Sequence, residues 1–168
     1  RFIRITDINN QGELNENGVF LEENDVPNEF ILNMNDVLFS RSGHTVGKSY
    51  FHILDGLFTS GGYLVRLNFG NFTESKYVFY LTKSQFYWDW ISLNTIVSTI
   101  ENVNGEKYKN FIYPKPPIIE QQKILEYLDQ KTKIIDETIS KEERRIELLK
   151  EYKQSLISEV VTGKIRVL

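Results

Sequence analysis

The segment from residue 35 to residue 50, NDVLFSRSGHTVGKSY, gathers the side chains in this chain best suited to recognition chemistry. Hydroxyl groups and two cations surround a pair of glycines, and the set is Ser40, Arg41, Ser42, Thr45 and Lys48. Hydroxyls, arginine and exposed backbone N–H groups contact DNA phosphates, and arginine also binds guanine bidentately in the major groove. From residue type alone, two interpretations stay open: an ordinary polar hairpin and a DNA-reading loop.

Catalytic chemistry has little support in the sequence. The 168 residues include no cysteine, and the two histidines, His44 and His52, leave little scope for a zinc site or for general base catalysis. A glycine-rich phosphate loop, a nucleophile elbow and an HExxH motif are all missing. The Glu-Tyr-Lys triplet at 151–153 has the spacing of a nuclease pair, but no upstream acid is placed to share a metal. We therefore predict no catalytic residue and no metal site.

The charge distribution allows DNA binding only as a local property. A net charge of −3 and a pI near 5.5 argue against a simple basic nucleic-acid binder. Between residues 37 and 83, however, cations exceed acids: Arg41, Lys48, Arg66, Lys76 and Lys83 stand against Asp55 and Glu74. A modest basic face of this kind is expected to need a partner's help to bind DNA.

No apolar run approaches the ~20 residues that cross a bilayer, and no signal peptide opens the chain. We expect a soluble, cytoplasmic protein without a membrane partner. The first residue is Arg1 rather than methionine, so we expect a part of a longer protein.

Composition changes abruptly near residue 116. Nine of the 10 glycines and 20 of the 22 aromatic residues precede it, whereas residues 118–162 contain neither glycine nor proline. Glycines and aromatic residues suit a compact core with turns, whereas a stretch without glycine and proline suits a long helix. The sequence therefore predicts two domains, 1–115 and 116–168.

The second domain has the pattern of a coiled-coil helix. Alternating steps of three and four residues from Leu125 meet apolar side chains at eight of eleven positions: Leu125, Leu128, Ile135, Ile139, Ile146, Leu149, Leu156 and Val160. Pro117 suits the first turn, and Gly163 suits the C-terminal end. A helix of ~45 residues cannot bury this seam by itself, so we expect a second helix against it. A helix folded back on its own domain is the less favoured alternative.

The first domain is expected to mix helices and strands. Candidate strands are 2–6, 36–40, 46–53 and 62–68, with a tight hairpin between the second and third. Residues 74–91 have helical spacing, and Asn71 with Glu74 is a start signal for that helix. The aromatic residues of 86–90 are expected in the core rather than as a base-stacking platform. The fold class is α+β: a small mixed domain followed by one long helix.

In its order of segments, the chain resembles the specificity subunit of Type I restriction-modification systems. The sequence runs from NDVLFSRSGHTVGK through GGYLVRL, a helix, and the polar stretch 98–110 to YPKPPIIEQQKILEYLD and the ending SLISEVVTGKIRV. The most specific parts are PPIIEQQKI at 116–124 and Val-Thr-Gly-Lys-Ile at 161–165. Each part is weak alone, but their order and spacing make the resemblance strong over nearly the whole chain.

The resemblance implies a target recognition domain, truncated at its front, followed by one conserved-region helix. Such a subunit reads half of a bipartite DNA target, pairs its helix antiparallel with a second one, and positions methyltransferase (M) and restriction (R) subunits. It is not itself an enzyme: S-adenosylmethionine, ATP and Mg would belong to the partners. The ending favours the C-terminal unit of the subunit, and a half-sized subunit working as a homodimer is the alternative. An isolated fragment is expected to dimerise through the seam.

The resemblance raises the expectation that Ser40, Arg41, Ser42, Thr45 and Lys48 face DNA, with Arg66 and Lys107 as weaker candidates. Lys107 rests only on its place in the polar stretch. Two other functions stay open. One is the C-terminal specificity region of a fused restriction-methyltransferase enzyme, and the other is a coiled-coil dimerisation module without a DNA role.

Overall fold

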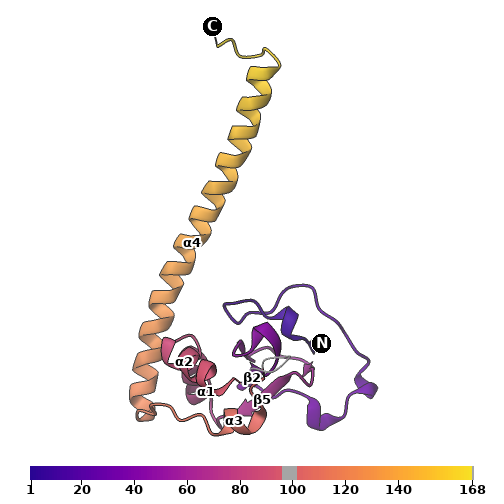
Figure 1. Cartoon of the computed structure of the whole chain (residues 1–168), viewed down its shortest axis with the longest axis vertical. Coiled ribbons are helices and arrows are strands. Elements are labelled where there is room, and N and C mark those ends of the chain that lie inside the picture. Colours follow the sequence, from indigo (N-terminus) through magenta and orange to yellow (C-terminus); the bar gives the residue numbers. More distant parts are fainter. Residues whose placement is uncertain (96–101, 168) are drawn as a thin grey trace. The chain divides into compact units, whose positions relative to one another are not determined.

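The computed structural model describes residues 1–95 and 102–167, and it divides into two compact units, 1–122 and 123–168 (Figure 1). The sequence had predicted domains at 1–115 and 116–168. The first turn of the long helix groups with the first unit because Gln121 is buried there and its Nε2 donates to Pro116 O at 2.9 Å. Helices and strands are mixed, with one long helix at the C-terminal side, so the α+β fold class is confirmed.

A three-stranded antiparallel sheet lies at the centre of the first unit. Strand β2 (Asp36–Ser40) pairs on one side with β3 (Ser49–Phe51) and on the other with β5 (Leu64–Asn68). All five β2 residues are buried, although Asp36 and Ser40 are polar. The predicted strand at 36–40 is confirmed, and those at 46–53 and 62–68 are shorter than expected.

Side-chain alternation along β2 divides the core between the two faces of the sheet. Val37 and Phe39 belong to one cluster of buried residues and Leu38 belongs to the other, as successive strand residues must point to opposite faces. The first cluster takes in helices α1 (Phe72–Leu81) and α2 (Gln85–Asn94), and the second takes in the N-terminal segment. Because both faces of β2 are covered, its sequence DVLFS can carry apolar side chains at every central position.

The single helix predicted at 74–91 is two helices. Thr82 Oγ1 donates to Phe79 O at 2.6 Å, and Ser84 Oγ accepts from Tyr87 N at 3.4 Å as the N-cap of α2. These short hydroxyl side chains compete with helical hydrogen bonding and break the helix between α1 and α2. The predicted start is confirmed, since Asn71 Oδ1 accepts from Glu74 N at 2.8 Å.

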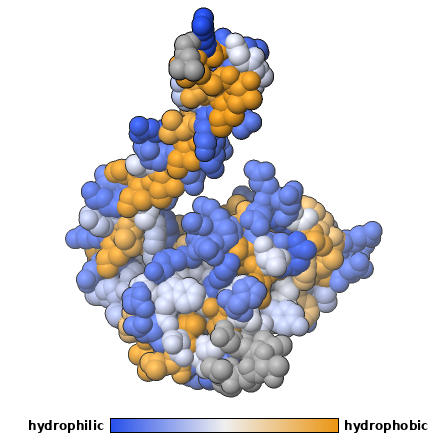
Figure 2. Space-filling model, turned by 45° about the horizontal axis from the view of Figure 1, so that its top comes forward, coloured by the Kyte–Doolittle hydropathy of each residue, from blue (hydrophilic) through white to orange (hydrophobic). Residues whose placement is uncertain are grey.

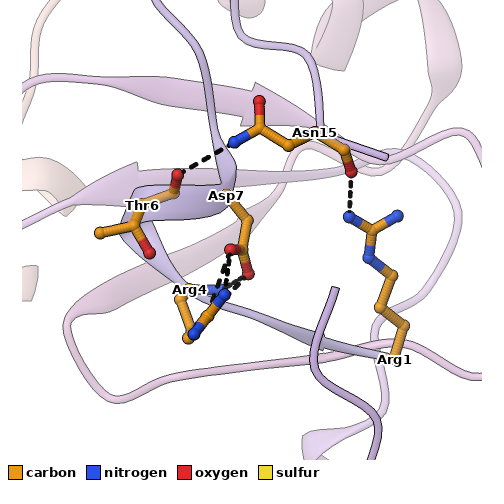
Figure 3. Close-up of polar contacts among 5 residues, drawn as sticks. All are labelled: Arg1, Arg4, Thr6, Asp7 and Asn15. Atoms are coloured by element: carbon orange, nitrogen blue, oxygen red, sulfur yellow. Dashed lines mark hydrogen bonds and ion pairs between the residues drawn. The ribbon is translucent and has the colours of Figure 1, made fainter. Parts of the chain in front are cut away.

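The predicted strand 2–6 is also interrupted. Strand β1 (Phe2–Ile3) pairs in parallel with β4 (Thr59–Ser60), which the sequence did not predict, and a 3₁₀ turn (Ile5–Asp7) follows β1. The Asp7 carboxylate holds this turn by accepting from Arg4 N at 2.9 Å and from the Arg4 guanidinium at 2.7 Å (Figure 3). The hydrogen bonds from Arg4 lower the pKa of Asp7 below its ordinary value.

A second polar contact ties the N-terminal segment to the turn that follows it. The Arg1 guanidinium donates to Asn15 O, and Asn15 Nδ2 donates to Thr6 O at 3.2 Å (Figure 3). Helix α3 (Gly105–Lys109) completes the first unit inside the polar stretch predicted at 98–110, of which residues 98–101 lie outside the described residues.

Helix α4 (Ile118–Val161) has 44 residues and confirms the predicted long helix. At its start, Pro117 O accepts from Glu120 N and Gln121 N. At its end, Gly163 adopts φ +74°, Lys164 N donates to Glu159 O at 2.9 Å, and Gly163 N donates to Val160 O at 3.1 Å. This pair of hydrogen bonds is a Schellman motif, which explains why a glycine stands in the Val-Thr-Gly-Lys-Ile ending.

The apolar seam of α4 is largely exposed. Ile135, Ile139, Ile146 and Leu149 expose 56%, 49%, 50% and 58% of their surfaces, and Leu156 exposes 39%. Leu128 and Val160 are half-buried and Leu125 is buried. Figure 2 shows hydrophobic patches along this helix. None of the helices in the described ranges is long and apolar enough to traverse a bilayer.

Candidate nucleic-acid interface

The predicted recognition loop connects β2 to β3 and contains a short 3₁₀ turn (Gly43–Thr45). Two glycines allow its backbone path, since Gly43 and Gly47 have φ +71° and +88°. A Cβ on Gly47 would approach the Trp88 ring to 2.8 Å, so glycine is also required by close packing there. The predicted antiparallel pairing of the two strands is confirmed, but the hairpin is not tight, because residues 41–48 connect β2 to β3.

Ser40 forms the base of this loop. Its Oγ lies 3.1 Å from Thr45 Oγ1, while its carbonyl accepts from Gly47 N at 3.1 Å and from Tyr108 Oη at 2.7 Å. Ser40 is fully buried, so it is shielded from any DNA on the surface and holds the two ends of the loop together. The expectation that Ser40 faces DNA is not met by this placement.

The remaining residues of the predicted set reach the surface. Arg41, Ser42, Thr45 and Lys48 are half-buried, as expected for side chains at the rim of a loop. Arg41 is fixed through its backbone, because its N–H donates to Tyr63 O at 3.0 Å and its carbonyl accepts from Val103 N at 2.9 Å. Its Nε is buried and has no hydrogen-bond partner among the described residues. The loop therefore presents hydroxyls and two cations from a fixed backbone.

The two weaker candidates are held by the chain itself. Arg66, on β5, donates to Ile31 O at 2.8 Å, and its Nε lies 3.6 Å from Asp36 Oδ2. Lys107, on α3, donates through Nζ to Asn94 O at the end of α2. These contacts tie distant segments of the first unit together, so we leave both residues outside the proposed contact set.

The aromatic run after Ser84 is only partly in the core. Tyr87 is fully buried and its Oη donates to Gly47 O at 2.9 Å, which supports the core interpretation and links α2 to the loop. Burial raises the pKa of Tyr87 well above its ordinary value, so this hydroxyl remains a donor. Phe86 and Trp88 instead expose 47% and 40% of their surfaces.

Lys83 lies beside the loop, although the sequence placed it only within a general excess of cations. It occupies the break between α1 and α2 and lines a pocket of about 440 Å³ together with Asn10, His44, Thr45, Lys48 and Trp88. The excess of cations between residues 37 and 83 included Lys83, but no spacing in the sequence indicates that it meets Lys48 across a pocket. In the described ranges 1–95 and 102–167, no three His, Asp or Glu side chains cluster as a metal site would require.

Comparisons with known proteins agree with this architecture. A family model described as the Type I restriction modification DNA specificity domain matches residues 1–148. The Type I restriction enzyme StySPI specificity subunit of Salmonella potsdam is 27% identical over 150 residues, covering 88% of this chain and 32% of that protein. The EcoKI specificity subunit of Escherichia coli (strain K12) has the same identity and coverage. The chain thus spans about a third of the length of these relatives.

A chain from a solved structure concerned with complex assembly and conformational transition of the type I R-M system has the same fold. The TM-score is 0.67 at 16% sequence identity, and the match covers 97% of the present chain and 42% of that chain. At this identity the likeness shows the fold alone. It extends over almost the full length of the chain.

Proposed function

Because the chain belongs to the Type I restriction modification DNA specificity domain family, we propose that it reads one half of a bipartite DNA target as a non-catalytic part of a specificity subunit. The match over residues 1–148 carries this proposal, because it includes both the recognition loop and most of α4. A coiled-coil module without a DNA role would not explain why the family match includes the whole first unit as well as the helix.

The loop supports the DNA-reading part of the proposal. Arg41, Ser42, Thr45 and Lys48 offer the donors that bind phosphates and base edges, and the strands β2 and β3 hold them on a rigid frame. Recognition of this kind needs side chains fixed within a fraction of an ångström, which a loop closed by Ser40 provides.

Helix α4 supports the assembly part. Its exposed stripe of isoleucine and leucine at heptad spacing is suited to an antiparallel helix: the second conserved-region helix in a complete subunit, or α4 of a second copy in the isolated chain. The paired helices would dock methyltransferase subunits, and restriction subunits would join through that complex. S-adenosylmethionine, ATP and Mg would then be bound by those partners.

Co-expression of the complete subunit with its methyltransferase subunit tests this function. We expect a stable complex that shifts, in a gel-mobility assay, a DNA fragment carrying the sequence that the complex methylates. It should bind a fragment in which that sequence is scrambled much more weakly. A complex that forms but binds both fragments equally would contradict the DNA-reading role. A chain that never copurifies with the methyltransferase would contradict the adaptor role.

A further inference from the structure

The pocket between the recognition loop and the α1–α2 break has a buried floor and a cationic rim. Ser49 and Thr82 are buried beneath it, and their hydroxyls lie 2.6 Å apart. Lys48 and Lys83 both line the pocket: Lys48 comes from the loop, and Lys83 comes from the break between α1 and α2. The fold thus brings together two lysines that are 35 positions apart in the sequence.

The Lys83 ammonium is held in place although the residue as a whole stays exposed. Its Nζ lies 3.4 Å from Ser49 Oγ and 4.4 Å from the centre of the Phe79 ring. The turn at Gly12 closes over the same group, since a Cβ on Gly12 would come within 2.8 Å of Nζ. A lysine fixed by a hydroxyl, an aromatic ring and a turn loses little conformational freedom when it binds an anion.

The electrostatics of the pocket favour an added negative charge. Desolvation lowers the pKa of Lys83 to about 8, the charge of Glu13 opposes that shift, and the charge of Lys48 adds to it. The two ammonium groups therefore repel each other, and an anion placed between them would relieve that repulsion. The Asn10 side-chain amide on the same lining can donate hydrogen bonds to its oxygens.

We propose that this pocket binds one backbone phosphate of the DNA, held between Lys48 and Lys83, and that it fixes the position of the recognition loop on the duplex. The inference rests on the proposed function. It adds a contact that specifies no base but sets the register from which Arg41 and Ser42 reach the groove.

The test uses the complete subunit assembled with its methyltransferase subunits and the cognate DNA duplex. Lys83→Gln should weaken binding about tenfold and lower the slope of log K against log salt by about 1, the value of one lost phosphate contact. Lys83→Arg should keep most of the affinity. Lys109→Gln is the matched control, because Lys109 is an exposed lysine of the same unit paired with Glu106 and lies outside the pocket.

Neutral methylphosphonates, placed one at a time along the duplex, identify the phosphate itself. One position should weaken the wild-type complex and have no further effect on Lys83→Gln. If no position shows this coupling, or if Lys83→Gln keeps the wild-type salt slope while sequence-specific binding persists, the pocket assignment is wrong and the proposed function stands. Loss of specific binding by the wild-type complex itself would instead contradict the proposed function.

Titration with inorganic phosphate, followed by Trp88 fluorescence, separates a DNA site from a site for free anions. Weak binding that the DNA duplex displaces supports the proposal. Tight phosphate binding that DNA does not displace would overturn it, since the pocket would then take a free anion.

Discussion

The first unit and helix α4 place their apolar side chains in opposite environments. In the first unit, Phe39, Leu38 and Tyr87 expose 2% of their surface or less. On α4, Ile135, Ile139 and Ile146 expose about half of theirs at 56%, 49% and 50%. Apolar residues are therefore buried in a core in the first unit and largely exposed to solvent on α4.

This difference implies two sources of stability. Burial against its own sheet and helices stabilises the first unit, at roughly 25 cal/mol per Å² of apolar surface removed from water. Helix α4 gains the free energy of apolar burial along its seam only when a second helix covers the seam. Substitutions in the first unit should therefore change its unfolding, whereas substitutions on the seam of α4 should change association.

The largest effect is expected from replacing Ile139 and Ile146 together by aspartate. Each change would place a carboxylate in the apolar seam, so association of the isolated chain should weaken at least ~100-fold. In sedimentation velocity, the wild type should be a dimer and the variant a monomer. Ser140→Asp with Gln154→Asp adds the same two carboxylates at exposed positions off the seam and should leave the dimer intact. A seam variant that still sediments as a dimer would refute this interface.

Phe39→Ala should have the next largest effect, and it should act on the first unit. Phe39 is buried in β2 and its ring lies 5.0 Å from that of Tyr108. The cavity left by the ring should lower the free energy of unfolding by about 3–5 kcal/mol. Urea unfolding followed by tryptophan fluorescence measures this change. Leu148→Ala, at an exposed position outside the seam, should change it by less than about 0.5 kcal/mol.

Arg41→Ala and Arg66→Ala should separate DNA contact from structural support. Arg41→Ala should lower the salt slope of DNA binding by the assembled complex by about 1, with little change in stability. Arg66→Ala should instead reduce stability by about 1–3 kcal/mol, because it removes the hydrogen bond to Ile31 O and the ion pair with the buried Asp36 carboxylate. If Arg66→Ala instead lowers the salt slope and Arg41→Ala instead lowers stability, Arg66 faces the DNA.

The smallest effect is expected from acidification, through His52. Burial lowers the pKa of His52 below its ordinary 6.5, although the charge of Asp36 opposes the shift. The unfolded chain then binds a proton that the native chain does not, so stability is full above pH 6.5 and falls as the pH decreases toward the native pKa. Unfolding measured between pH 7 and 5 should show this slope.

His52→Asn should remove most of that slope between pH 6.5 and 5, whatever its effect on absolute stability. His44→Asn is the control, since His44 is exposed on the loop. An unchanged slope in His52→Asn would assign the pH dependence to another group.

The sequence predicted the parts of the structure that local chemistry decides. Helix α4 followed from heptad spacing and from Gly163, and the start of α1 followed from Asn71 and Glu74, because caps and periodicity act within a few residues. The family resemblance was confirmed by the match over residues 1–148. Strand β2 was also predicted, since an apolar run between turn residues is a local signal.

Features that depend on distant partners were missed. The two residues of β4 are a strand only because β1, far earlier in the chain, lies beside them. The break at Ser84, by contrast, has a local cause in the Thr82 and Ser84 hydroxyls, which helical spacing alone does not reveal. Ser40 was expected at the surface, but its burial depends on Tyr108, 68 residues later. The pocket at Lys83 has the same origin, because it joins three segments that the sequence keeps apart.

The closed base of the recognition loop has a consequence for how specificity can change. Ser40 holds the loop through backbone groups of Gly47 and through Tyr108, so the loop's shape does not depend on the side chains of Arg41, Ser42 or His44. If the loop reads DNA as proposed, substitutions at those positions should alter the bases that are read without unfolding the support beneath them. New target sequences should then be accessible through few mutations, each with little effect on stability.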